Sequence, residues 1–112
     1  MSAARYDLVI DQGSDFAIEF TVKESGSAKN LSGYSARAQL RPSKTSSTLS
    51  ATFTCGIPTP ANGKINMTLA NATSKTLTAG RYHYDLEIFT GSDALVTRLL
   101  FGEVTLTQEV TR

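Results

Sequence analysis

Apolar and polar residues alternate along most of this chain, in short runs separated by Gly, Ser, Asn and Pro. The clearest run is 16–22, where every second residue is a large apolar one. A period of two places one set of side chains on a buried face and the other in solvent, as in a half-buried β-strand. We count about seven or eight such runs. The pattern therefore predicts an all-β protein.

The spacing of the runs indicates how the strands are arranged. They recur about every ten residues with turn residues between them, which is typical of two packed β-sheets. We therefore expect a single domain over residues 1–112. Its predicted fold is an antiparallel two-sheet immunoglobulin-like β-sandwich of about seven to eight strands. Only residues 71–77 favour a short helical turn, and Gly102, inside the run 96–110, predicts a β-bulge.

The inward positions of the runs predict the core, which comprises Phe16, Ile18, Phe20, Tyr34, Leu40, Phe53, Ile65, Leu69, Tyr82, Leu86 and Ile88. Gly13 and Gly33 are expected in tight turns, the second of which aims Tyr34 inward. Gly80 precedes a strand that begins near Tyr82. A tyrosine at this place predicts a tyrosine corner, in which the hydroxyl binds upstream backbone.

Charge and composition narrow the class of protein. The chain has 11 basic and 10 acidic residues, so it has no charge excess typical of a nucleic-acid or anionic-membrane partner. No apolar run approaches the roughly 20 residues that cross a bilayer. The first residues carry no secretory signal pattern, and we expect no Sec export. The single cysteine, Cys55, excludes an internal disulfide and favours a reducing compartment.

Candidate chemistry is sparse. His83 is the only histidine, and it is expected on an outward strand face, where packing is the simpler role. Asp7, Asp11 and Asp15 recur every four residues but lack the dense oxygen loop that calcium requires. We therefore expect no enzymatic activity, no cofactor, no metal and no small-molecule substrate.

The clearest feature of the predicted surface is a set of charged and aromatic residues on outward strand faces. Arg37 and Arg41 share one outward face, and Asp85 and Glu87 share another. If these strands are neighbours, cross-strand ion pairs form, either as a solvated ladder or as a protein interface. Phe89 and Phe101 add apolar surface to the predicted interface. The stretches 6–10 and 104–110 carry little protection against edge pairing, so we expect them to be open edges.

Four stretches resemble one family. Residues 6–16, with a QGxxF pattern, and residues 30–41 resemble small virion proteins of tailed bacteriophages and prophages. Residues 79–86 and 98–104 are similar to the later parts of the same proteins. A related pattern occurs in the N-terminal domain of phage baseplate upper proteins. Asn30 and Ser32 stand where the family usually has Asp and Thr, a mild departure.

The resemblance implies a structural component of the virion, in the tail or baseplate, that packs against other virion proteins and copies of itself. It also implies assembly in the host bacterial cytoplasm. A head decoration or neck protein is an alternative, and so is a receptor- or carbohydrate-binding module. The last would need a platform of exposed aromatic rings, which a chain without Trp and with inward tyrosines provides poorly.

Overall fold

Strands account for most of the regular structure in the computed structural model, which describes residues 3–24, 26–91 and 94–111. Within these residues the strands are β1 (Ala4–Arg5), β2 (Leu8–Asp11), β3 (Phe16–Thr21), β4 (Lys23–Glu24), β5 (Ser27–Ala28), β6 (Ser35–Arg41), β7 (Ala51–Gly56), β8 (Lys64–Leu69), β9 (Gly80–Phe89) and β10 (Val96–Thr107). A 3-10 turn covers Pro60–Asn62, and the helix α1 covers only Asn71–Ser74. The all-β prediction is confirmed.

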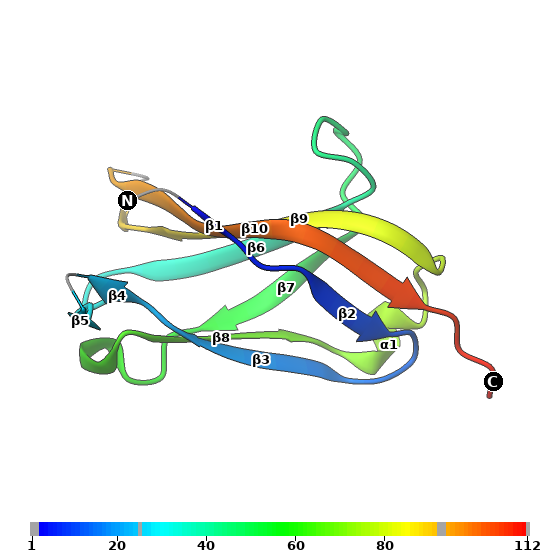
Figure 1. Cartoon of the computed structure of the whole chain (residues 1–112), viewed down its shortest axis with the longest axis horizontal. Helices are drawn as coiled ribbons and strands as arrows, with labels where there is room; N and C mark the ends of the chain where they lie inside the picture. The colour runs from blue at the N-terminus through cyan, green and yellow to red at the C-terminus, as the bar shows by residue number, and fades with distance from the viewer. Residues whose placement is uncertain (1–2, 25, 92–93, 112) are drawn as a thin grey trace.

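Eight strands form one sheet in the order β1-β10-β9-β6-β7-β8-β3, with β2 also paired to β10 (Figure 1). The remaining strands, β4 and β5, form a small hairpin. Most pairs are antiparallel, but β1 and β2 run parallel to β10. The prediction of a wholly antiparallel fold is therefore wrong, because the first strands pair with the last.

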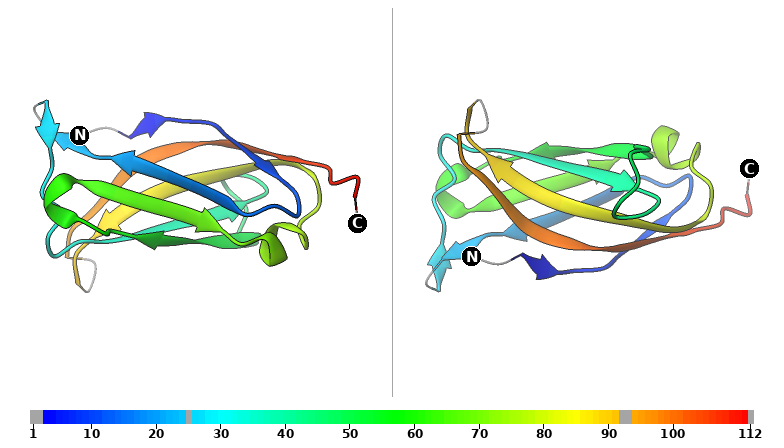
Figure 2. Two further views of the ribbon diagram at one scale, coloured as in Figure 1. Left: turned by 90° about the horizontal axis from the view of Figure 1, so that it is seen from below. Right: turned by 90° about the horizontal axis from the view of Figure 1, so that it is seen from above.

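The sheet curls so that β3 and β8 lie opposite β9 and β10, as both views of Figure 2 show. The two halves are not separate, because β7 belongs to both. Its first half pairs with β6 through Ala51 and Phe53, and its second half pairs with β8 from Thr54 onward. The structure thus has one continuous, curled mixed sheet where the sequence predicts two sheets.

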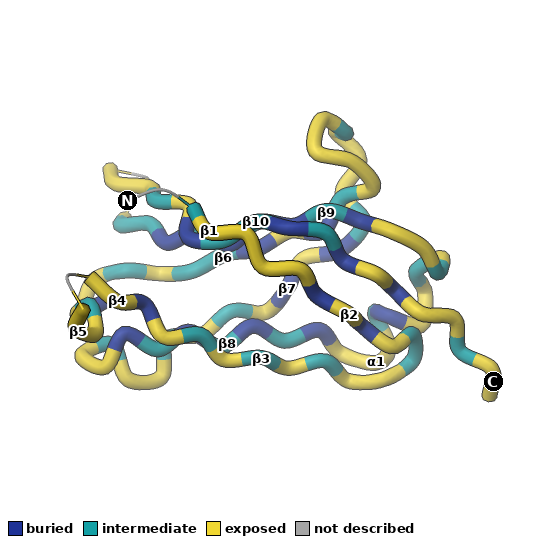
Figure 3. The backbone as a smooth tube through the Cα atoms, viewed as in Figure 1, coloured by how far each residue is buried: buried dark blue, intermediate teal, exposed yellow. Residues whose placement is uncertain are grey.

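The core lies inside this curl, and buried and exposed residues alternate along β2 and β10 (Figure 3). Of the predicted core, seven residues are buried: Leu40, Phe53, Ile65, Leu69, Tyr82, Leu86 and Ile88. The other four, Phe16, Ile18, Phe20 and Tyr34, are partly buried and pack against it. Three of these lie on β3, which has a paired strand on one side only, so solvent reaches them. The predicted inward register of β3 is correct.

Gly102 has a different role from the one predicted. The pairing of β10 with β9 slips between Arg98 and Leu100, so the bulge lies before Gly102. Gly102 is buried, and a Cβ there would lie against the Tyr6 carbonyl oxygen and 2.9 Å from the carbonyl carbon. The glycine is therefore required for close approach of the N-terminal segment. Val104 and Leu106 face inward, as expected.

The predicted turn and corner residues adopt specific geometries. Gly13, with φ 82°, and Gly33, with φ 84°, are left-handed, a conformation that favours glycine. The Asn30 side chain accepts a hydrogen bond from the backbone of Ser32 at 2.9 Å, which fixes the second turn. Gly80 is the first residue of β9, and the Tyr82 hydroxyl donates to the Thr78 carbonyl, the contact expected of a tyrosine corner.

Candidate functional site

The outward faces of β6, β9 and β10 form one continuous surface, called the outer face below. The β6–β9 register places Arg37 beside Glu87 and Arg41 beside His83. The Arg37 Nε atom lies 2.8 Å from the Glu87 Oε1 atom, in a half-exposed ion pair. The two charged strands are thus neighbours, and the expected cross-strand pairing follows.

Both predicted phenylalanines lie on the outer face beneath cations. The Arg37 guanidinium lies 4.3 Å from the centre of the Phe89 ring. The Lys44 ammonium and the Arg98 guanidinium lie 5.6 and 6.0 Å from the centre of the Phe101 ring. Cations at such distances are attracted to the ring face. All four residues predicted for an interface, Arg37, Arg41, Phe89 and Phe101, therefore gather on one surface.

The segment 42–50, which connects β6 to β7, stands off the sheet beside this surface (Figure 1). A cleft of about 590 Å³ lies between its first residues and the outer face. We call this the outer cleft, and the outward polar and aromatic side chains that line it are Arg37, Gln39, Arg41, Ser43, Lys44, His83, Asp85, Glu87, Arg98 and Phe101. Protein ligand sites have volumes of about 300–1,000 Å³, so the cleft can admit a short segment of another molecule.

The two carboxylates of the outer cleft, those of Asp85 and Glu87, lie near arginine side chains. Burial, together with repulsion from Glu87, raises the pKa of Asp85, and the charges of Arg98, Arg41 and Arg37 oppose this rise. Arg98 is the nearest of these cations, with 3.9 Å between its Nη1 atom and Asp85 Oδ2. The carboxylates of the cleft are therefore balanced largely from within the chain.

His83 lies on the outer face, as expected of an outward residue, and it is partly buried. Its Nδ1 atom is buried and has no hydrogen-bond partner among the described residues. A buried polar atom without a partner is uncommon in folded proteins and costs about 1–3 kcal/mol. The sequence does not reveal this feature, because strand periodicity gives the side of a residue but not its partners.

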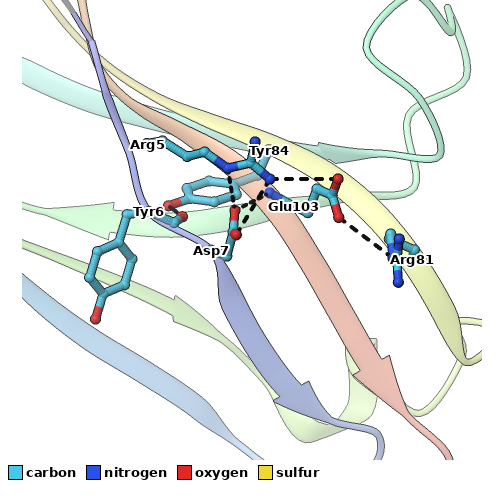
Figure 4. A network of polar contacts seen from close by, with 6 residues as sticks. All are labelled: Arg5, Tyr6, Asp7, Arg81, Tyr84 and Glu103. Atoms are coloured by element: carbon cyan, nitrogen blue, oxygen red, sulfur yellow. Dashed lines mark hydrogen bonds and ion pairs between the residues drawn. The ribbon is translucent and has the colours of Figure 1, made fainter.

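The N-terminal segment runs alongside β10, and a compact polar network joins the two between β1 and β2 (Figure 4). Between β1 and β2, the Tyr84 hydroxyl donates to the Tyr6 carbonyl oxygen, and the Asp7 Oδ1 atom accepts the Glu103 backbone N–H at 3.0 Å. That bond, followed by the hydrogen bond from Arg5, lowers the pKa of Asp7. The Asp7 side chain thus replaces a backbone acceptor where the strand is interrupted.

The turn that follows β2 is a second network, and sequence reasoning found only its glycine. The Gln12 side chain donates to the Leu77 carbonyl at 2.7 Å and accepts from the Glu109 backbone at 2.8 Å. The Gly13 N–H donates to the hydroxyl of Ser74, which is fully buried. The QGxxF pattern therefore has a structural explanation, since it ties three distant segments together.

The three aspartates at spacing four point to different partners. Asp11 accepts from the Thr107 hydroxyl at 2.8 Å, and Asp15 accepts from the Asn71 backbone at 2.7 Å. The hydrogen bonds from Asn71 lower the pKa of Asp15. Within the described ranges, no group of three or more His, Cys, Asp or Glu side chains is arranged to hold a metal ion.

Burial raises the pKa of the half-buried Cys55 thiol to about 11.

The open edges of the sheet are β3 on one side and β1 with β2 on the other. The first predicted edge is therefore correct in place, although Tyr6 and Asp7 interrupt it. The second is wrong, because residues 104–107 lie in β10 between β2 and β9 and are paired on both sides. Val9 on β2 is 65% exposed and leaves apolar surface beside the first edge.

These features define an all-β protein with a mixed-charge outer face and two open sheet edges. In the part of the chain that the structure describes, no helix is long and apolar enough to span a bilayer. No protein-family model and no curated protein matches the sequence. Among solved structures, the chain is similar to the N-terminal domain of phage TP901-1 ORF48. The TM-score is 0.58 at 11% identity, over 96% of this chain and 100% of that chain, which shows a shared fold.

Proposed function

We propose that this chain is a structural component of a tailed-phage virion, in the tail or baseplate, that packs against other virion subunits and copies of itself. The outer face carries the proposal, because it gathers Arg37, Arg41, Phe89 and Phe101 on three adjacent strands. Arginine and aromatic residues are enriched in protein interfaces. The motifs of the sequence and the fold shared with a phage protein domain both support this role. The proposal assigns no reaction, cofactor or nucleic acid to the chain.

We also propose that the curled sheet is a variant of the immunoglobulin-like sandwich in which β7 serves both layers. The tyrosine corner at Tyr82 supports this relation, since such corners are a mark of immunoglobulin-like domains. The packing of the Phe16 ring on the Phe53 ring, 6.2 Å between centres, supports it too, since these residues lie on different parts of the curl. In this view, β2 joins the layer that contains β9 and β10 by pairing in parallel with β10.

The alternatives differ in what they require of the surface. A head decoration or neck protein would use the same kind of packing at another position in the particle. A carbohydrate-binding module would need neighbouring exposed rings. Tyr82 and Tyr84 are buried, Tyr34 packs against the core, and cations lie near the ring of Phe101. Tyr6 is 46% exposed, but its ring meets Phe20 edge on, with 5.4 Å between ring centres. This aromatic placement favours protein packing over sugar binding.

The test is a cryo-EM map of the parent particle combined with the double variant Arg37→Glu and Arg41→Glu. We expect the outer face or an open edge to be covered by another chain, and the variant to impair assembly while the purified domain stays folded. Lys23→Glu with Lys75→Glu is the matched control, since both lysines are exposed and lie outside the outer face. A map in which the outer face and both edges remain in solvent would contradict the proposal. The receptor- or glycan-binding alternative would then come first.

A further inference from the structure

Among the residues that the structure describes, the outer cleft has more basic than acidic side chains. Arg37, Arg41, Lys44 and Arg98 line it, against the carboxylates of Asp85 and Glu87. The hydrogen-bond acceptors around Arg41 are neutral, namely Gln39 Oε1 at 2.8 Å and the Ser46 carbonyl at 3.4 Å. Lys44 lies against the Phe101 ring. Among the described residues, neither Arg41 nor Lys44 lies within ion-pair distance of a carboxylate.

The charges are also separated along the cleft. The register places the Arg37–Glu87 pair at one end and Arg41 beside His83 at the other, with Asp85 between them. Glu103, opposite His83 on β10, could have supplied a carboxylate to that second end. Its carboxylate instead lies 3.6 Å from Arg5 and 3.5 Å from Arg81, as Figure 4 shows. The end near Arg41 is therefore the electropositive end.

Two further features of the cleft match an external ligand. His83 lines the cleft, so the accessible part of its ring lies within contact of a bound segment. The volume of about 590 Å³ admits a short segment of chain rather than a whole domain. A nucleic acid has a negative phosphate at every nucleotide, so one of its phosphates would lie near the Asp85 carboxylate and repel it. A peptide can place a neutral residue beside Asp85 instead. The charge pattern therefore favours a protein segment with spaced carboxylates.

We propose that the outer cleft is the docking site for an acidic segment of another virion protein, whose carboxylates bind Arg41 and Lys44. The inference rests on the proposed function and names the partner that its interface takes. Charge-assisted hydrogen bonds are stronger than neutral ones, and a partly buried cleft screens them less than open solvent does. The segment would also cover His83.

The test uses the full chain labelled with ¹⁵N and three probes: a peptide of alternating Glu and Ser, its counterpart of alternating Lys and Ser, and single-stranded DNA. We expect the Glu peptide to shift the amide signals of β6, β9 and residues 42–50 by millimolar concentration, and the Lys peptide to leave them unchanged. The variant Arg41→Gln with Lys44→Gln is expected to weaken binding about tenfold or more. Lys23→Gln with Lys75→Gln removes the same charge elsewhere, and it should change the affinity by less than about twofold.

Each outcome separates the possibilities. Absence of shifts with the Glu peptide, shifts spread over the whole surface, or equal loss of binding in both double variants would overturn the acidic-segment proposal. DNA binding as tight as peptide binding, at the same residues, would show a general anion site and would also overturn it. The particle map tests the proposed function separately, because the outer face can be buried there by a partner that leaves the outer cleft empty.

Discussion

The two faces of β9 and β10 differ in how their polar groups are satisfied. On the inner face, the Tyr84 hydroxyl bonds to the Tyr6 carbonyl and Gly102 admits the same segment at close range. On the outer face, one residue away in each strand, His83 Nδ1 has no hydrogen-bond partner among the described residues, and Phe101 lies near Lys44. Among the described residues, the polar side chains of the inner face are thus paired within the chain, whereas His83 on the outer face is not. Stability therefore resides on one side of these strands, and the proposed binding on the other.

The largest effect is expected from Gly102→Ala. The new Cβ would press against the Tyr6 backbone, which is held by β1 and β2 and cannot move as a side chain tip can. We expect a loss of about 2–3 kcal/mol in the free energy of unfolding, measured by chemical denaturation. Gly91→Ala is the control, since a Cβ at that position would have no atom of the other described residues within 4 Å beyond its chain neighbours. Equal midpoints for both variants would show that the N-terminal segment is not tightly packed against Gly102.

A smaller loss is expected from removing one tyrosine hydroxyl. Tyr82→Phe deletes the bond to the Thr78 carbonyl, and we expect a loss of about 1–2 kcal/mol in the free energy of unfolding with the fold intact. Tyr84→Phe deletes the corresponding bond to Tyr6 and should behave similarly. Denaturation curves with an unchanged midpoint for Tyr82→Phe would mean that this residue does not act as a corner.

The stability that Tyr84 contributes on the inner face should decrease at alkaline pH. Burial, together with the nearby negative charge of Asp7, raises the pKa of Tyr84 above its usual 10.0. The unfolded chain then loses this proton at lower pH than the folded chain, so the stabilisation is complete below pH 10.0 and decreases as pH rises toward the raised pKa. We expect Tyr84→Phe to flatten the decline of unfolding midpoints above that pH. An equally steep decline in the variant would assign the effect to other groups.

The smallest effect on stability is expected on the outer face. Arg41→Gln with Lys44→Gln removes two exposed or half-exposed charges that have no carboxylate partner among the described residues, and surface changes of this kind alter stability by less than about 0.5 kcal/mol. Thermal and chemical unfolding should therefore match the parent chain, even though peptide binding is lost. A large drop in stability would show that the outer face is part of the fold after all.

Periodicity predicted what depends on nearest neighbours along the chain. The inward register of β3, the tyrosine corner at Tyr82 and the turn at Asn30 all follow from local patterns. The placement of Arg37 opposite Glu87 also follows, once their strands are adjacent. These features need no knowledge of the rest of the sheet.

The errors concern contacts between distant segments. A glycine within a strand allows either a bulge or a close approach, and only the position of Tyr6 decides between them at Gly102. The bonds of Gln12 to Leu77 and Glu109 join residues 65 and 97 positions apart, so no local pattern reveals them. The shared strand β7 likewise depends on how the two halves of the sheet meet.

The parallel pairing of β2 with β10 gives the molecule a direction in which it resists tension. The strand β1 lies toward one end of the long axis, which extends 44 Å, and β10 ends toward the other (Figure 1). A pull on the segments before β2 and after β10 slides two parallel strands past each other, from Leu8 beside Val104 to Asp11 beside Thr107. The evenly spaced bonds of a parallel ladder then share the load together instead of opening one after another. A pull along this axis would therefore load β2 and β10 in shear, the direction in which a parallel ladder resists separation most.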